Sequence, residues 1–502
     1  MLRSTRFVLL ASLILPPAGL VLLWLRSGDR LGRKILGSAL IACWGVAYLA
    51  LFFGLRFPLD GSGLRPIPTF KNREAHYAEL ERNRAGQGIA AYVETAQPSA
   101  DPVKQESAAR AEVRPGSAYW TDFRGPQRDG RYDQSPVRAQ WPASGLPLVW
   151  RQPVGGGYAS FVIVNGRAFT IEQRRHQEVA TAYDMATGRE LWAHGWDGEF
   201  QESLGGDGPR ATPTWHDGRV YALGAAGELR CLDAGTGKRT WSRNILADNG
   251  AQNLQWGMSA APLIVDDKVI VLPGGTAGRS VAAYNKLTGE PVWKALDDSQ
   301  AYTSPMLVTL AGKRQILVVS ASRVMGVTVE NGALLWEYPW VTEYEINSAQ
   351  PIILGPNRVF ISAGYGHGST VLEIAAVDGK YQVKEIWMNN RMKNRFSSSV
   401  LFEGNIYGFD EAIFGCINAE TGELKWKGGR YGYGQVLLIG GNLVVTSESG
   451  ELALVKPTPE RHQELSRFQA VSGKTWNHPA ISDGLLLVRN ETEMACFRMS
   501  AE

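Results

Sequence analysis

Short apolar stretches separated by polar turns recur from residue 120 to the end of the chain. Each repeat consists of an apolar strand, a turn, a second apolar strand and then the motif Asp/Asn-x-x-Thr-Gly-x-x-x-Trp. Short apolar runs bounded by glycine-containing turns are typical of antiparallel β-strands. The pattern therefore predicts an all-β region built from one repeated unit.

The chemistry of the motif explains its residue types. The Asp or Asn side chain accepts hydrogen bonds from backbone amides later in the turn, and the Gly adopts the left-handed conformation that reverses the strand. The Trp should lie on an outer strand, pack against a neighbouring sheet and donate its indole N–H to a carbonyl. The residues with these structural roles are Asp184, Gly188, Trp192, Asp233, Gly237, Trp241, Gly289, Trp293, Trp336, Trp387, Gly422 and Trp426.

The spacing of the motif predicts the architecture. The Trp positions, with Phe in the last, are 150, 192, 241, 293, 336, 387, 426 and 468, and they lie about 45 residues apart on average. A period of 40 to 50 residues with four short strands is typical of a β-propeller with one blade per repeat. We therefore expect an all-β, eight-bladed propeller with four-stranded antiparallel blades over residues 119–502.

The two ends of the repeat region should complete each other. Residues 475–499 contain three strands and no Trp strand, whereas Trp150 has no strands of its own repeat before it. Together they make one blade, which closes the ring and leaves no open edge between first and last repeats. Removal of residues 476–502 should therefore destabilise the whole ring.

Two uncharged apolar segments, residues 7–25 and 35–55, precede the repeats and are each long enough to cross a bilayer as a helix. The loop between them contains Arg26, Arg30, Arg33 and Lys34, which places it in the cytoplasm by the positive-inside rule. Residues 1–60 are thus predicted to form a two-helix transmembrane hairpin in the bacterial inner membrane, with the propeller facing the periplasm. A cleaved first segment or a lipidated Cys43 are the alternatives.

Residues 61–118 are predicted to link the hairpin to the propeller. The charged part, residues 71–92, favours a short solvated helix. Residues 95–118 are rich in Pro, Ser, Ala and Glu, a composition that cannot bury a core and is typical of a flexible tether.

Composition narrows the possible functions. The formal net charge is +3 over 502 residues, which argues against a nucleic-acid partner. Four cysteines form no CxxC motif, and seven histidines form no HxH or HxxxH pair, so neither a haem nor a sequence-local zinc site is predicted. Three of the cysteines occupy equivalent strand positions in different blades, and they are interpreted as buried apolar residues too far apart for a disulfide: Cys231, Cys416 and Cys496.

The repeat resembles the pyrroloquinoline-quinone (PQQ) repeat of eight-bladed quinoprotein propellers, and residues 120–130 are similar to the run that opens many such bacterial proteins. The resemblance covers residues 119–499 and implies the fold. One branch of the family comprises quinoprotein alcohol dehydrogenases, which bind PQQ and Ca²⁺ at the ring centre and carry a vicinal disulfide. The other comprises non-catalytic BamB-like propellers, which bind partner polypeptides.

This chain has no adjacent cysteines and is shorter than the dehydrogenases. We therefore expect a non-catalytic, membrane-anchored scaffold that binds a protein partner in the cell envelope, without cofactor, metal or catalytic residues. The alternative is a PQQ-dependent dehydrogenase that oxidises an alcohol or a sugar and uses PQQ and Ca²⁺. One fold hosts both activities, so the resemblance alone leaves the choice open.

A binding site is predicted where the innermost strands begin, at one mouth of the ring channel. The leading positions of these strands are Tyr158, Arg210, Ser259, Tyr302, Ser348, Ser397, Tyr433 and Trp476, with Trp256 on a nearby loop and His478 close to the axis. Tyr, Trp and Arg dominate interface hot spots, although the same side chains could simply fill and solvate the channel. Long loops at 196–202, 338–345 and 388–395 should lie on the same face.

Overall fold

The structure is a computed structural model that describes residues 5–26, 29–53, 55–56, 59–62, 64–66, 69–70, 73–87, 119–202 and 205–500. The chain divides into two compact units, residues 1–79 and 80–502. The first unit contains the apolar N-terminal segments and the second contains the repeats.

The first apolar segment forms two short helices, α1 (Thr5–Ile14) and α2 (Pro16–Trp24), whereas the second forms one long helix, α3 (Leu31–Phe53). The break falls at Leu15, whose backbone is not helical and has a φ of −140°. A residue before proline disfavours the helical conformation, so Pro16 forces this break. Among the described residues, α3 is the helix long and apolar enough to cross a membrane, and a hairpin of two spanning helices is not clearly formed. A two-residue pair of strands, β1 (Leu55–Arg56) and β2 (Thr69–Phe70), follows α3.

The charged stretch after the apolar segments contains the predicted helix, α4 (Arg73–Gly86). The helix is not simply solvated, however, because Leu80 and Arg84 are buried. The predicted flexible tether, residues 95–118, lies outside the described residues.

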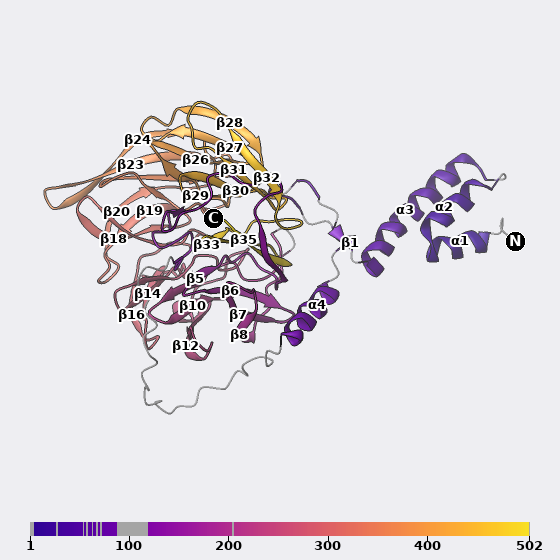
Figure 1. The fold of residues 1–502 in the computed structure, drawn as a ribbon, viewed down its shortest axis with the longest axis horizontal. Helices are drawn as coiled ribbons and strands as arrows, with labels where there is room; N and C mark the ends of the chain where they lie inside the picture. The colour runs from indigo at the N-terminus through magenta and orange to yellow at the C-terminus, as the bar shows by residue number, and fades with distance from the viewer. Residues whose placement is uncertain are drawn as a thin grey trace. The chain divides into compact units, whose positions relative to one another are not determined.

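The repeats form a ring of eight sheets, and the four repeat strands of blades 1 to 7 follow one another in sequence from the innermost to the outermost. In Figure 1 the ring is visible with β5, β29 and β33 toward its centre and β12, β16, β24 and β28 at its periphery. The first four blades are β5 (Val162–Val164), β6 (Arg167–Arg174), β7 (Gln177–Asp184) and β8 (Glu190–Asp197); β9 (Thr214–His216), β10 (Arg219–Leu223), β11 (Glu228–Asp233) and β12 (Arg239–Asn244); β13 (Leu263–Val265), β14 (Lys268–Val271), β15 (Val281–Asn285) and β16 (Pro291–Ala295); and β17 (Met306–Leu310), β18 (Lys313–Val319), β19 (Arg323–Val327) and β20 (Leu334–Pro339).

The remaining blades follow the same order, and a short helix, α5 (Ile245–Asn249), leads out of blade 2. Blades 5 to 8 are β21 (Ile352–Ile353), β22 (Arg358–Ala363), β23 (Gly368–Val377) and β24 (Lys380–Asn389); β25 (Val400–Phe402), β26 (Asn405–Asp410), β27 (Ile413–Asn418) and β28 (Leu424–Arg430); β29 (Gln435–Ile439), β30 (Asn442–Thr446), β31 (Glu451–Val455) and β32 (Glu464–Gln469); and β33 (Ala480–Ser482), β34 (Leu485–Arg489), β35 (Glu493–Arg498) and β4 (Leu148–Pro153). An extra strand, β3 (Arg131–Tyr132), pairs in parallel with β29 on the axial side of blade 7.

The predicted closure of the ring is confirmed. Strand β4 pairs antiparallel with β35, and Trp150 lies opposite Cys496 in the register. The last blade is therefore built from both ends of the repeat region. Buried apolar side chains form clusters that each join neighbouring blades, so the core lies between the blades.

The Trp of the motif connects each blade to the next, as its side-chain chemistry predicts. Trp192 donates its indole N–H to the carbonyl of Ala234 at 3.0 Å, and Trp241 does the same to Lys286 at 3.1 Å. Trp336 differs and donates to Gln315 of its own blade at 2.6 Å. The reason is that blade 5 replaces the Thr-Gly turn with the long β23–β24 hairpin.

The three cysteines of the ring are free and buried, as predicted. Each lies on the third strand of its blade, opposite a Trp in the register. Burial raises the pKa of the Cys231 thiol to about 12, so it behaves as an apolar residue.

Candidate binding site at the channel mouth

The inner strands begin at one end of the ring channel, and the residues just before them form what we call the mouth. Small buried residues such as Ala159 and Ala211 follow the leading positions, because eight strands crowd the axis. Hydroxyl groups at this level connect neighbouring blades: Ser160 donates to the carbonyl of His478 at 2.6 Å, and Thr303 donates to that of Asn347 at 2.9 Å. The mouth is therefore held rigidly by bonds from blade to blade.

Four aromatic side chains form a continuous arc on one side of the mouth. The ring of Tyr158 lies 5.5 Å from that of Trp476, Trp476 lies 4.5 Å from Phe396, and Phe396 lies 5.6 Å from Tyr433. These distances are typical of stacked and tilted aromatic pairs. Three of the four residues were predicted from the sequence; Phe396 was missed because it precedes the small residue used to locate the strand.

A second aromatic pair lies elsewhere on the mouth. Trp256, from the loop before blade 3, packs 6.0 Å from Tyr302 of blade 4. The ring contacts of the described residues thus bring the predicted aromatic residues together in two groups.

Cationic side chains lie against the aromatic arc and bond to nearby groups. Arg210 stacks on Tyr158 at 5.3 Å and on Phe200 at 4.8 Å, and its two terminal nitrogens donate to the carbonyls of Gly208 and Gly206 at 2.7 Å. Lys474, which sequence reasoning missed, lies 4.1 Å from the ring of Trp476. Burial lowers the pKa of this ammonium, yet its contacts with aromatic faces favour the charged form.

Opposite the cations, acidic side chains bind the aromatic residues. Glu491 accepts a hydrogen bond from the Tyr158 hydroxyl at 2.7 Å, and Glu448 accepts one from the Trp476 indole at 2.9 Å. Burial, followed by the charge of Glu491, raises the pKa of Tyr158 well above its ordinary value. The polar groups of the mouth thus hold the aromatic rings in place, and Tyr158 stays protonated at neutral pH.

The channel beneath the mouth is crossed by the segment that opens the repeat region. Arg128 donates to the carbonyls of Ala261 at 3.2 Å and Pro305 at 2.8 Å, in blades 3 and 4. Arg124 donates to those of Val436 at 3.1 Å and Ser399 at 2.9 Å, in blades 7 and 6.

Both arginines are almost fully buried and both adopt a left-handed backbone, with φ of 63° and 58°. Such conformations are uncommon outside glycine and persist where surrounding bonds fix them. We call residues 120–130 the axial plug. The two guanidinium groups of this plug donate hydrogen bonds to opposite sides of the ring.

His478 lies beneath the mouth, against the axial plug. Its Nδ1 is 3.4 Å from a terminal nitrogen of Arg124, and its ring meets Phe123 edge-on at 4.8 Å. Burial, followed by the charge of Arg124, lowers the pKa of His478 well below its ordinary value. The neutral imidazole therefore acts as a packed partner of the axial plug.

The predicted loops begin later than the sequence indicated. Trp196, Tyr338 and Met388 each belong to the last strand of a blade, and Trp196 is buried. The basic loop does reach the mouth, where Arg395 stacks on Tyr365 at 4.1 Å and on Tyr433 at 5.3 Å.

The residues present do not fit a quinoprotein metal site. A calcium ion takes six to eight oxygen ligands, usually with several carboxylates. Across the part of the chain that the structure describes, no three His, Cys, Asp or Glu side chains converge to hold a metal, and Glu491 and Glu448 bind the aromatic arc.

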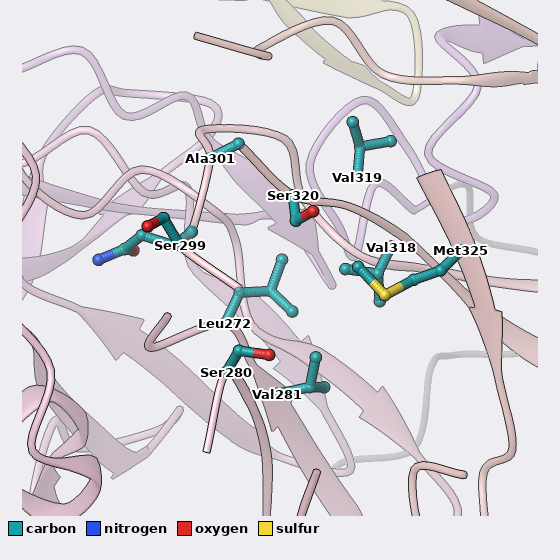
Figure 2. A pocket seen from close by; sticks show the side chains of 10 residues that line it. Leu272, Ser280, Val281, Ser299, Ala301, Val318, Val319, Ser320 and Met325 are labelled. Carbon is teal, nitrogen blue, oxygen red and sulfur yellow. The ribbon is translucent and has the colours of Figure 1, made fainter. Parts of the chain in front are cut away.

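A small cavity lies between blades 3 and 4. It has a volume of about 10 Å³ and is lined by Leu272, Val281, Val318, Met325 and their neighbours (Figure 2). That volume holds about one water molecule and no organic cofactor.

The known proteins that match this chain agree with the resemblance of its repeat to that of PQQ-repeat propellers. The family model described as outer membrane protein assembly factor BamB matches residues 175–427. Quinohemoprotein alcohol dehydrogenase ADH-IIG of Pseudomonas putida is 26% identical over 295 residues, which cover 56% of this chain and 34% of that protein. Outer membrane protein assembly factor BamB of Shewanella oneidensis is 25% identical over 151 residues, or 28% of this chain and 36% of that protein.

Solved structures share the fold. That of quinohemoprotein alcohol dehydrogenase ADHIIG from Pseudomonas putida HK5 superposes with a TM-score of 0.52 at 14% identity, covering 76% of this chain and 81% of that one. The chain spans between 19% and 34% of the length of three dehydrogenases that it matches, a quinoprotein and a quinohemoprotein alcohol dehydrogenase and a 1-butanol dehydrogenase. With the eight-bladed ring and a model that matches half of its residues, the chain belongs to the family of PQQ-repeat propellers described as outer membrane protein assembly factor BamB.

Proposed function

We propose that this protein is a membrane-anchored, non-catalytic propeller that binds a protein partner in the cell envelope through its mouth. The observation that carries the proposal is the arc of Tyr158, Trp476, Phe396 and Tyr433, which is fixed in place by Glu491 and Glu448. Tyr, Trp and Arg, which meet at this mouth, are the residue types that dominate interface hot spots. The BamB relatives, named as assembly factors, support the same reading.

The anchor part of the proposal rests on α3, a helix of 23 residues that contains an 18-residue window with a mean hydropathy of 2.1. Basic residues between α2 and α3 favour a cytoplasmic position for that loop. The propeller would then face the periplasm of a bacterial inner membrane. A reporter fused to the C-terminus tests this: alkaline phosphatase should be active, and a fusion active only in the cytoplasm would overturn the orientation.

The binding face is tested by changing Tyr302, Tyr433 and Trp476 to Ala together in the full chain. We expect this triple variant to lose the partner that the parent protein retains after solubilisation from membranes, while its circular dichroism and melting temperature show a folded ring. A matched control changes Leu148, Val292 and Leu465 to Ala, because these exposed apolar side chains lie on outer strands away from the mouth. Equal retention by both triple variants would refute the assigned face.

The quinoprotein dehydrogenase remains the competing function, since relatives of that class match a large part of the ring. Titration of the full chain with PQQ and Ca²⁺, followed by absorbance and by dye reduction with alcohols and sugars, separates the two. We expect no stoichiometric complex, because no three Asp, Glu, His or Cys side chains converge among the described residues, whereas calcium sites usually contain several carboxylates. A one-to-one complex that reduces dye would replace the scaffold proposal with an enzyme.

A further inference from the structure

The seam between the last and the first blade holds part of α4, a segment from outside the ring. Leu80 and Arg84 in its last two turns are 1% and 7% exposed. Arg84 donates from one terminal nitrogen to the carbonyl of Pro153 at 3.0 Å and to the Tyr183 hydroxyl at 3.2 Å. Pro153 ends β4 of blade 8 and Tyr183 belongs to β7 of blade 1. One side chain therefore touches both sides of the seam.

Arg84 also enters a buried group of charges. Its Nε lies 3.1 Å from a carboxylate oxygen of Glu190, which Arg174 also binds, and Arg174 in turn binds Glu172. Gln87, just after the helix, accepts a hydrogen bond from the backbone N–H of Glu190 at 3.1 Å. Burying charges is costly unless each has a partner, so this arrangement holds together as a set.

A second arginine crosses the same seam from inside. Arg489 of blade 8, fully buried, donates to Thr170 of blade 1 at 3.0 Å and to the carbonyl of Gly155 at 2.8 Å. Burial would raise the pKa of Glu172, but Arg174, and after it Arg489 and Arg84, hold that pKa below its ordinary value. The carboxylates of Glu172 and Glu190 thus depend on cations from three separate parts of the chain. These cations are Arg84, Arg174 and Arg489.

The position of Arg84 matters because ring closure depends on β4. Among the described strands of blade 8, β4 alone comes from the N-terminal side of the repeats, and it is held by pairing with β35. Arg84 binds the carbonyl at the end of this strand and the first blade at the same time. Its loss would leave the Pro153 carbonyl without this donor and Glu190 with one cation fewer.

We propose that residues 80–87 form a latch that locks the closing seam of the propeller. The stable folding unit then begins at Leu80 and not at residue 119, where the repeats start.

The first test compares Arg84→Gln with Glu81→Gln in the full chain. Glu81 is on the same helix and pairs with Arg175 at 2.8 Å, but both side chains are exposed, so it serves as the matched control. Amide hydrogen exchange should become at least tenfold faster in β4 and β35 of Arg84→Gln and stay unchanged in β18 and β19 of blade 4. Exchange like the parent protein, or equal acceleration in every blade, would overturn the latch.

The second test cuts the chain only after the protein has folded. A protease site is placed between residues 95 and 105 of the full chain, and the purified protein is cleaved there after folding. The fragment that carries α4 should stay bound to the propeller on size-exclusion chromatography and leave it when Leu80→Asp is introduced. Dissociation of the parent fragment on cleavage would show that no latch exists.

Discussion

At the scale of single residues, the motif works because its Trp and its Gly meet across blades. A Cβ atom on Gly188 would lie 2.5 Å from the ring of Trp150 in the preceding blade, and Gly237 is placed in the same way against Trp192. The glycine therefore has two roles. It adopts φ of 70° in the turn, and it leaves room for the neighbouring indole.

These two roles can be separated by experiment. Gly166 also has a positive φ, of 73°, but nothing lies within 4 Å of its missing Cβ. Both Gly188→Ala and Gly166→Ala should lose about 1 kcal/mol from the left-handed backbone. Gly188→Ala should lose about 1 to 3 kcal/mol more, because Trp150 must move. Chemical denaturation measures both losses, and equal values would contradict a packing role for the glycine.

His194 gives a second prediction at this scale. It is 3% exposed, its Nε2 lies 3.4 Å from a terminal nitrogen of Arg230, and its ring packs against Trp196. Burial, followed by the charges of Arg230 and Arg239, lowers its pKa to about 4. The folded state therefore keeps the imidazole neutral while the unfolded state takes up a proton below its ordinary pKa of 6.5.

Stability that depends on the neutral form is complete above pH 6.5 and is lost as the pH falls toward 4. The loss amounts to at most about 3 kcal/mol. We expect His194→Gln to unfold with a weaker dependence on pH than the parent protein between pH 7 and pH 4.5, as measured by thermal unfolding. Because both proteins share all carboxylates, parallel pH curves would show that His194 does not titrate in this range.

At the scale of elements, the axial plug and the latch show where sequence reasoning stopped. The blades could be predicted because the Trp motif recurs at a regular interval, and each copy fixes one turn and one outer strand. Arg124 and Arg128 occur once each, in a segment without period, so nothing in the sequence indicated that they cross the channel. Arg84 lies in a run of charged residues that favours a solvated helix, yet its guanidinium is buried.

The axial plug should contribute to the stability of the whole ring. Arg124→Met would leave the carbonyls of Val436 and Ser399 without this donor, at a cost of about 1 to 3 kcal/mol for each buried group. We expect the free energy of unfolding to fall by about 3 kcal/mol, seen as a lower denaturation midpoint. Arg131→Met is the control, since Arg131 is exposed on the neighbouring strand β3. A variant as stable as this control would contradict the bracing role.

At the scale of the whole molecule, the number of blades and their closure follow from the sequence, whereas the arrangement of the mouth does so only in part. Leading positions such as Tyr158 and Trp476 could be located because small residues and an apolar strand follow them. Their contacts could not, because the arc is completed by Phe396 from a loop and is held by Glu491 and Glu448. The N-terminal helices differ for a local reason, as Pro16 divides the first apolar segment.

Closure of the ring through β4 and β35 should require all eight blades. A chain that ends at residue 475 loses β33, β34 and β35, so β4 has no partner and the blade 8 half of the Arg489 contacts disappears. Buried residues of blades 7 and 1, such as Leu437 and Tyr183, then face water at two open edges. Unpaired edges and exposed core favour aggregation over a smaller ring. We expect the truncated chain to form soluble aggregates on size-exclusion chromatography, whereas a chain that ends at residue 500 behaves as the full protein. A monomeric truncated protein with a cooperative melt near that of the full chain would mean that seven blades can close, and that the eighth serves a purpose other than sealing the ring.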